Sequence, residues 1–247
     1  IIRSVHEPNT YFHGSQYLLK TTDMGKTWKE ASPDLTRNEK DKQGRPGVPY
    51  TNEAVGAENY GTLAYIAESP LEKGVIWTGS DDGLVQLTRD GGATWKNVTP
   101  KDLAECLVNA IEVSPFDKGT AYIATTRYKF NDHRPGLYKT TDYGATWTPI
   151  SGNLPTYAIN VVVQDKKNAN LLYVGNDRGV WVTFDGGGQW TRLLANGTGN
   201  TTYVFSTILV DFLAGLAIGA LALALATHAL TLRFALQPGD FARLAPL

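Results

Sequence analysis

Short runs of alternating apolar and polar residues recur in a fixed order along the first 194 residues. One run covers residues 137 to 147, LYKTTDYGATW, and similar runs cover residues 18 to 28, 85 to 95 and 180 to 190. Each copy has an aliphatic residue five positions before an aspartate, a threonine two before it, a glycine two after it and a tryptophan five after it. Alternation over four to eight residues is typical of a half-buried strand, so each copy predicts a strand, a tight turn and a second strand.

The residues of the turn have distinct physical roles. The aspartate can accept hydrogen bonds from backbone N–H groups two or three residues on, and the glycine tolerates positive φ. The tryptophan is expected to cover the turn and bury its ring at the start of the next strand. We therefore predict a structural role for the following residues. They are Asp23, Gly25, Trp28, Asp90, Gly92, Trp95, Asp142, Gly144, Trp147, Asp185, Gly187 and Trp190.

The pattern [ST]-x-D-x-G-x-[TQ]-W resembles the Asp-box, also called the bacterial neuraminidase repeat. It is similar to the version found in sortilin-type propellers and in bacterial glycosyl-hydrolase-like repeat proteins. The resemblance covers about residues 1–194 and implies an all-β propeller fold. In these families the box is structural and not catalytic.

Each repeat is longer than its box. The second and third copies share an upstream turn, S-P-x-[DE]-K-G, at residues 69–74 and 114–119. With its flanking strands, each unit reads as four short strands, which is one propeller blade. The predicted blades cover about 1–31, 61–99, 109–150 and 160–194.

Four blades predict a partial or small propeller, because Asp-box propellers in these families have six or more blades in a ring. Three explanations stay open. The chain has lost blades, meets another chain that completes the ring, or closes unusually tightly. Two insertions, at 32–60 and 127–136, are expected to project from one face, where a scaffold presents binding residues. The alternative is that they are solvated, variable loops.

The composition changes near residue 200. After a linker at 195–203, the segment 204–236 is almost uncharged, and a tail follows at 237–247. A helix over residues 212–232 would be about 31 Å long, which is enough to cross a bilayer. We predict a transmembrane helix; the alternatives are a buried helix and a stretch foreign to the gene. Since Arg233 and Arg243 follow the apolar run, the C-terminus is expected in the cytoplasm and the propeller on the periplasmic or extracellular side.

The net charge, the cysteine content and the histidine spacing exclude several classes of function. With a net charge of −1 and no basic run, the chain lacks the electrostatics of a nucleic-acid-binding protein. Cys106 is the only cysteine, which excludes an internal disulfide and leaves a buried thiol as its expected role. The histidines show no metal-binding spacing, so neither a metal nor another cofactor is expected.

Candidate catalytic residues are few. Sialidase activity is not expected, because the arginines do not recur at equivalent blade positions. Xyloglucan-cleaving glycosidases with Asp-box propellers use two carboxylates, one as acid and one as base. The nearest candidates are Asp81, Asp82 and, at the matching turn of the fourth blade, Asp177. Because such residues recur in the repeat, the alternative is that they shape turns.

Two functional hypotheses follow. The first is a non-enzymatic propeller that binds a protein or a glycan outside the membrane, as part of a membrane-associated assembly. The second is a xyloglucanase-like glycoside hydrolase, or a fragment of one. The sequence leaves open whether the chain is an enzyme.

Overall fold

The computed structural model describes residues 1–43 and 60–195. They belong to the first of two units into which the chain divides, 1–202 and 203–247. No helix within the described ranges is both long and apolar enough to cross a membrane. The predicted transmembrane segment at 204–236, the tail at 237–247 and all but the first residue of the predicted linker lie outside the described residues.

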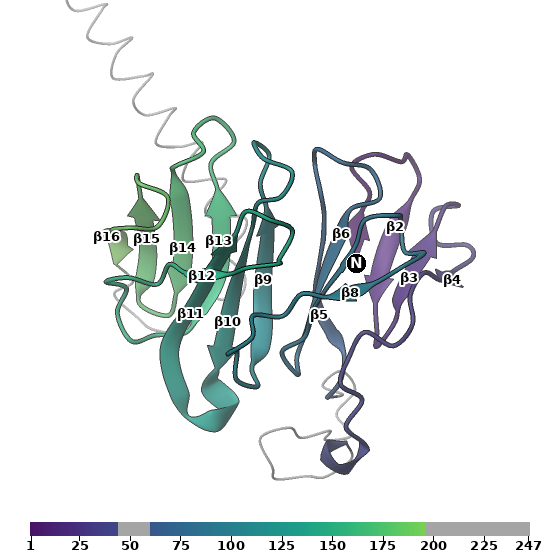
Figure 1. The fold of residues 1–247 in the computed structure, drawn as a ribbon, viewed down its shortest axis with the longest axis horizontal. Coiled ribbons are helices and arrows are strands. Elements are labelled where there is room, and N and C mark those ends of the chain that lie inside the picture. Colours follow the sequence, from purple (N-terminus) through teal and green to yellow (C-terminus); the bar gives the residue numbers. More distant parts are fainter. Residues whose placement is uncertain (44–59, 196–247) are drawn as a thin grey trace, which may run out of the picture. The chain divides into compact units, whose positions relative to one another are not determined.

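The described residues form four antiparallel sheets of four strands each, and in each sheet the strands follow chain order (Figure 1). The first blade contains β1 (Ile2–Arg3), β2 (Tyr11–Gly14), β3 (Leu18–Thr21) and β4 (Lys29–Glu30). The second contains β5 (Leu63–Glu68), β6 (Ile76–Ser80), β7 (Val85–Thr88) and β8 (Lys96–Asn97). The third contains β9 (Leu107–Val113), β10 (Ala121–Arg127), β11 (Asp132–Thr140) and β12 (Thr148–Pro149). The fourth contains β13 (Ile159–Gln164), β14 (Leu172–Asn176), β15 (Gly179–Thr183) and β16 (Thr191–Ala195).

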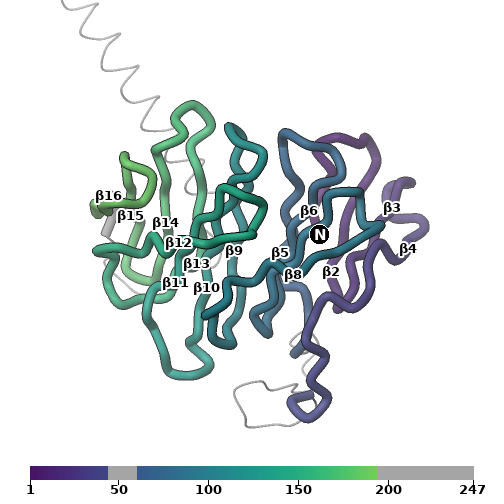
Figure 2. The backbone as a smooth tube through the Cα atoms, in the orientation of Figure 1, coloured from purple at the N-terminus to yellow at the C-terminus, as the bar shows by residue number. Residues whose placement is uncertain are grey.

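This architecture confirms the predicted all-β fold of four four-stranded sheets, a partial β-propeller. The chain completes each meander before it crosses to the next blade (Figure 2). Two short 3-10 helices, η1 (Lys40–Lys42) and η2 (Tyr128–Phe130), lie in the connections.

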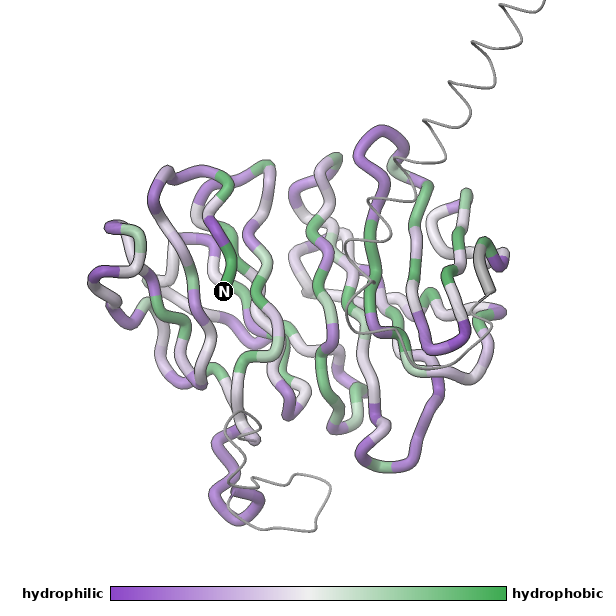
Figure 3. Tube along the Cα trace, turned by 180° about the vertical axis from the view of Figure 1, so that it is seen from behind, coloured by the Kyte–Doolittle hydropathy of each residue, from purple (hydrophilic) through white to green (hydrophobic). Residues whose placement is uncertain are grey.

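The apolar core lies between successive blades and not within any one of them. One buried cluster joins blades 1 and 2, a second joins blades 2 and 3, and a third joins blades 3 and 4. Strand β10 shows why, because alternate residues point to opposite faces of a sheet. Ala121 and Ile123 belong to the cluster shared with blade 2, whereas Tyr122 and Ala124 belong to the one shared with blade 4. Apolar residues follow the strands and hydrophilic ones gather in the loops (Figure 3).

The Asp-box turns share one hydrogen-bond pattern, shown here for the third box. Thr140 Oγ1 donates to Asp142 Oδ1 at 2.8 Å and accepts the Gly144 N–H at 2.9 Å. Asp142 Oδ1 also accepts the Thr146 N–H, four residues on, at 2.9 Å. The printed bond of this box is one residue longer than the predicted reach of two or three, because the threonine takes the glycine N–H, whereas in the fourth box Asp185 Oδ1 also accepts the Gly188 N–H, three residues on, at 2.8 Å. Two consecutive residues with positive φ, Tyr143 and Gly144, make the turn of the third box possible.

The same bonds set the charge state of the box aspartates. Hydrogen bonds from the threonine four residues on hold the pKa of Asp23, Asp90 and Asp142 at about 2. The pKa of Asp185 is lowered too, by bonds that begin with the Thr183 hydroxyl. The boxes are therefore ionised at neutral pH and accept their turn hydrogen bonds as carboxylates.

The box tryptophans also join the blades. Trp95 Nε1 donates to the carbonyl of Ala31 at 3.1 Å, Trp147 Nε1 to that of Val98 at 2.7 Å, and Trp190 Nε1 to that of Ile150 at 2.9 Å. Each acceptor lies in the preceding blade, just after its outermost strand. The expectation that the ring covers its own turn is thus incomplete, because the indole also bonds to a neighbouring sheet.

The second predicted insertion, 127–136, is mostly strand and not loop. Strand β11 begins at Asp132 and pairs with β10 through Arg127 opposite Asp132, after a register shift. Helix η2 forms the turn, and Asn131 ends it with a φ of 54°. The polar composition that indicated a loop belongs to a hairpin that extends beyond the neighbouring blades (Figure 1), where His133 and Arg134 are exposed.

Candidate functional site

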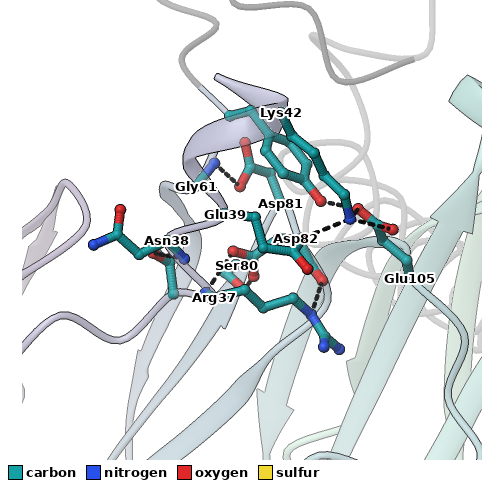
Figure 4. A network of polar contacts seen from close by, with 11 residues as sticks. Arg37, Asn38, Glu39, Lys42, Gly61, Ser80, Asp81, Asp82 and Glu105 are labelled. Carbon is teal, nitrogen blue, oxygen red and sulfur yellow. Dashed lines mark hydrogen bonds and ion pairs between the residues drawn. The ribbon is translucent and has the colours of Figure 1, made fainter. Parts of the chain in front are cut away.

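Both insertions and all three candidate carboxylates lie at the same end of the strands. The chain reaches this end after the second and the fourth strand of each blade, since neighbouring strands are antiparallel. Residues 32–43, Tyr60, the β6–β7 turn and the β10–β11 turn all lie there (Figure 1). We call this end of the blades the insertion face. Its polar network, drawn in Figure 4, contains the residues considered next.

Asp82 is fully buried and anchors the start of the first insertion. Its Oδ2 accepts the backbone N–H of Arg37 at 2.7 Å, and its carbonyl accepts Arg37 Nε at 2.9 Å. Ser80 donates its hydroxyl to the other carboxylate oxygen. A buried carboxylate needs such donors, because burial without partners is costly. Asp82 therefore ties blade 2 to the insertion 45 residues earlier in the chain.

Asp81 holds the other end of the insertion. Its Oδ1 accepts the N–H groups of Gly61 and Thr62, both at 2.9 Å, where the chain enters β5. Burial raises the pKa of Asp81 to about 6 although these two bonds lower it. A carboxyl with that pKa exchanges its proton near neutral pH, which is a property of catalytic acids.

Glu105 forms a third attachment, in the connection between β8 and β9. Lys42 Nζ lies 3.0 and 2.9 Å from its two carboxylate oxygens, and the Tyr60 hydroxyl donates to the same carboxylate. Burial alone would lower the pKa of Lys42, but the carboxylates of Glu39 and Glu105 raise it to about 12. The two described parts of the insertion therefore meet at one glutamate.

The β10–β11 hairpin is joined to the same connection. Arg127 donates from Nη1 to the Glu105 carbonyl and from Nε to Asp132 at 3.1 Å. Hydrogen bonds from Arg134, and also from Arg127, hold the pKa of Asp132 far below its usual range. Cys106 is buried and burial raises its pKa to about 12, so this residue is a protonated core thiol at neutral pH.

The predicted carboxylates do not come together as a set. Asp81 and Asp82 share the β6–β7 turn, but each faces a different end of the insertion. Asp177 lies two blades away, is exposed, and accepts from Asn160 Nδ2 at 3.0 Å. Sequence reasoning missed Glu105, Arg37 and Arg127, whose roles depend on partners in distant loops. Within residues 1–43 and 60–195, no group of three or more His, Cys, Asp or Glu side chains could hold a metal ion.

A pocket of about 450 Å³ lies next to the Trp147 joint. The connection from Thr99 to Leu103 forms one side, and Tyr138, Trp147 and Pro149 form the other. None of the three candidate carboxylates lines it.

Comparison of the sequence with models of known protein families shows which family the chain belongs to. The family model described as Sortilin-Vps10, with the words "Sortilin, neurotensin receptor 3", matches residues 83–208, slightly more than half of the chain. The chain belongs to the Sortilin-Vps10 family. The predicted resemblance to sortilin-type propellers is therefore confirmed.

This Sortilin-Vps10 chain also matches curated xyloglucanases. It is 26% identical over 165 residues to one from Paenibacillus sp, covering 60% of the chain and 16% of that relative. It is 26% identical over 153 residues to one from Hypocrea jecorina (strain QM6a), covering 55% of the chain and 18% of the relative. The chain thus spans less than a fifth of the length of either relative.

Solved structures show the same propeller fold in this Sortilin-Vps10 chain. An ancestral GH74 enzyme superposes with a TM-score of 0.60 at 16% identity, covering 80% of this chain and 24% of the enzyme. The GH74 xyloglucanase from Xanthomonas campestris gives a TM-score of 0.56 at 17% identity, covering 77% and 29%. At these identities the likeness concerns the fold, and it supports the prediction of a glycosyl-hydrolase-like propeller.

Proposed function

We propose that this chain is a non-enzymatic binding module whose insertion face takes a xyloglucan-type glycan. One observation carries the proposal: three carboxylates on that face that are buried or half-buried, Asp81, Asp82 and Glu105, are already engaged by the chain's own donors. Asp82 and Asp81 hold the two ends of the insertion, and Glu105 holds Lys42 and Tyr60. Hydrolysis of a glycoside needs one carboxyl to reach the leaving oxygen and a second at about 5 to 9.5 Å from the first. Carboxylates that accept hydrogen bonds from loops hold those loops in place and so give a rigid surface.

The glycan class rests on the relatives and on the residues at this face. Both curated relatives are named xyloglucanases, so xyloglucan is the ligand that their names suggest. Sugar rings present apolar faces that stack on aromatic side chains. Tyr128, in η2, is 45% exposed at the insertion face, beside Arg127 and Phe130. Such a residue can contact a sugar ring while the polar network stays intact.

A second candidate function rests on Asp81. Its pKa of about 6 suits a general acid, so a glycoside hydrolase in which Asp81 protonates the leaving oxygen is the alternative. The base would then be a carboxylate on a neighbouring blade. Under this alternative Asp81→Asn abolishes sugar release and leaves binding unchanged.

Calorimetric titration with xyloglucan oligosaccharides tests the binding proposal, with reducing-sugar release measured on the same samples. We expect binding without hydrolysis, and a Kd raised at least about tenfold in Tyr128→Ala, since a stacked ring contributes roughly 1.4 kcal/mol. Phe116→Ala is the matched control, because Phe116 is 43% exposed but lies in the β9–β10 turn at the opposite end of the strands. Equal loss in both variants, or no binding, would refute the proposal; sugar release that depends on Asp81 would establish the alternative.

We further propose that the segment 204–236 anchors the module in a membrane, with the blades on the periplasmic or extracellular side and the C-terminus in the cytoplasm. The support is its apolar length and the arginines that follow it. Protease added to intact spheroplasts should digest the blades and spare a tag placed after Leu247. Complete extraction of the protein by a carbonate wash would contradict the anchoring.

A further inference from the structure

Each of the three connections between blades passes the box tryptophan of the next blade and contains a leucine. After Ala31 the leucine stands four positions on, at Leu35, and after Ile150 it also stands four positions on, at Leu154. Leu35 is 1% exposed and Leu154 is 7% exposed, and each belongs to the apolar cluster between its two blades. A buried leucine therefore closes the joint between blades 1 and 2 and the joint between blades 3 and 4.

The connection between blades 2 and 3 is one residue longer. Its leucine, Leu103, stands five positions after Val98, the residue whose carbonyl accepts the Trp147 indole N–H. The fourth position holds Asp102, which is exposed. Leu103 is only half-buried and belongs to none of the buried clusters of the described residues. With the extra residue the leucine does not close this joint, and the pocket of about 450 Å³ lies between Leu103 and Trp147.

The joint between blades 3 and 4 is also closed by a polar contact. Asn153, which precedes Leu154, donates from Nδ2 to the Trp190 carbonyl at 2.9 Å, and its Oδ1 accepts the Trp190 N–H at 2.8 Å. One carboxamide thus satisfies both backbone groups of the box tryptophan. Between blades 2 and 3 the corresponding residue, three positions after Val98, is the exposed Lys101. Lysine cannot replace the carboxamide, because its ammonium group has donors only.

The backbone N–H and C=O of Trp147 have no such partner among the described residues. Strand β12 is the outermost of its sheet, and the Ile150 N–H points inward to the Leu137 carbonyl. Because bonding alternates along an antiparallel strand, Trp147, three residues earlier, turns its N–H and C=O away from β11. Tyr138, Trp147 and Pro149 line the pocket. The pocket therefore combines an apolar lining with a backbone donor and a backbone acceptor that no other described residue uses.

We propose that this pocket binds a peptide segment of a partner protein in which an asparagine is followed by a leucine. The asparagine carboxamide bonds to the N–H and C=O of Trp147 as Asn153 bonds to those of Trp190. The leucine enters the pocket as Leu154 enters the neighbouring joint. Backbone groups at a sheet edge are a common docking place for peptides, with a side-chain pocket giving specificity. The chemistry of the occupant is thus the one that the chain itself uses at the next joint.

Two further observations bear on the occupant. The stretches 44–59 and 196–247 contain no asparagine followed by leucine, so neither supplies the pair. The pocket shares no lining residue with the network of Asp81, Asp82 and Glu105. Peptide binding here is therefore independent of glycan binding at the insertion face.

An NMR titration of peptide resonances with the full chain, in a mild detergent, tests the site. The probe is the end-blocked peptide ISGNLP, the sequence of residues 150–155. We expect saturable binding with a Kd below about 1 mM. Aspartate in place of the asparagine removes the donor to the Trp147 carbonyl, and serine in place of the leucine removes the apolar side chain, so each should raise the Kd at least about tenfold. Equal affinity for the three peptides, or no saturation by ISGNLP up to about 10 mM, would overturn the proposal.

A variant that fills its own pocket shows where the peptide binds. Lys101→Asn with Asp102→Leu places an asparagine and a leucine three and four positions after Val98, as they stand after Ile150. This pair should occupy the pocket, raise the peptide Kd at least about tenfold and raise the melting temperature, because a leucine becomes buried. Lys101→Ser with Asp102→Ser is the matched control, because it removes the same two charges but supplies neither carboxamide nor leucine.

The serine control should bind the peptide as the wild type does. Both positions are exposed, so both double variants should fold, and circular dichroism checks this. Undiminished peptide binding by the asparagine–leucine variant would place the peptide elsewhere and overturn the proposal. An equal loss in the serine control would do the same, because it would assign the binding to the two charges.

Discussion

Replacing Trp190 by alanine is expected to lower the free energy of unfolding by about 3 to 5 kcal/mol. Its ring is 3% exposed and packs in the cluster between blades 3 and 4, beside Leu154 and Leu172. The substitution leaves a cavity at that joint and removes the bond to the Ile150 carbonyl, so that this carbonyl loses its donor. Urea unfolding followed by tryptophan fluorescence and circular dichroism measures the loss.

Trp28→Ala is the matched control, since Trp28 occupies the same position of the repeat but its indole N–H meets no other blade among the described residues. Its ring contacts His13 edge to face, with centroids 6.0 Å apart. We expect a loss of about 1 kcal/mol. Equal losses in the two variants would mean that the box tryptophan stabilises its own blade and not the joint.

Replacing Asp82 by alanine is expected to cost about 3 kcal/mol, with the loss concentrated in the first insertion. The substitution removes a fully buried carboxylate, so the Arg37 N–H loses its acceptor and the Ser80 hydroxyl keeps only the Leu84 carbonyl, at 3.2 Å. The start of the insertion should detach, and trypsin should then cut faster after Arg37 and Lys40. Melting curves and timed proteolysis measure the two effects; unchanged cleavage would show that Asp82 does not anchor the loop.

At the neighbouring Asp81, removal of the charge is expected to raise the free energy of unfolding and not to lower it. Because the folded pKa of about 6 exceeds the reference 3.8, the folded state binds the proton more tightly, and this stability is lost as pH rises from about 4 to about 6. Asp81→Asn mimics the protonated form, so it should be more stable than wild type at pH 8, by about 1 to 3 kcal/mol, and equal to it near pH 4. A variant less stable than wild type at pH 8 would show that the carboxylate charge holds Gly61 and Thr62.

The sequence determined the blades, because their causes are local. Alternation over a few residues shows which side of a strand is buried, and the glycine of each box allows the positive φ that the turn requires. The four sheets and the families with similar repeats could both be predicted from these patterns alone. The charge state of the box aspartates is local too, because their donors lie within four residues in the chain.

Only the tertiary structure decided what joins the blades and what the acidic residues do. Trp95, Trp147 and Trp190 bond to carbonyls that stand 64, 49 and 40 residues earlier in the chain. Asp82 and Glu105 find their donors in an aperiodic insertion 45 and 63 residues away, so no spacing in the sequence marks Arg37 or Lys42 as partners. The sequence around a carboxylate at a strand end is the same whether that carboxylate faces a ligand or a loop. Its role is set by which donors the fold brings within hydrogen-bond distance.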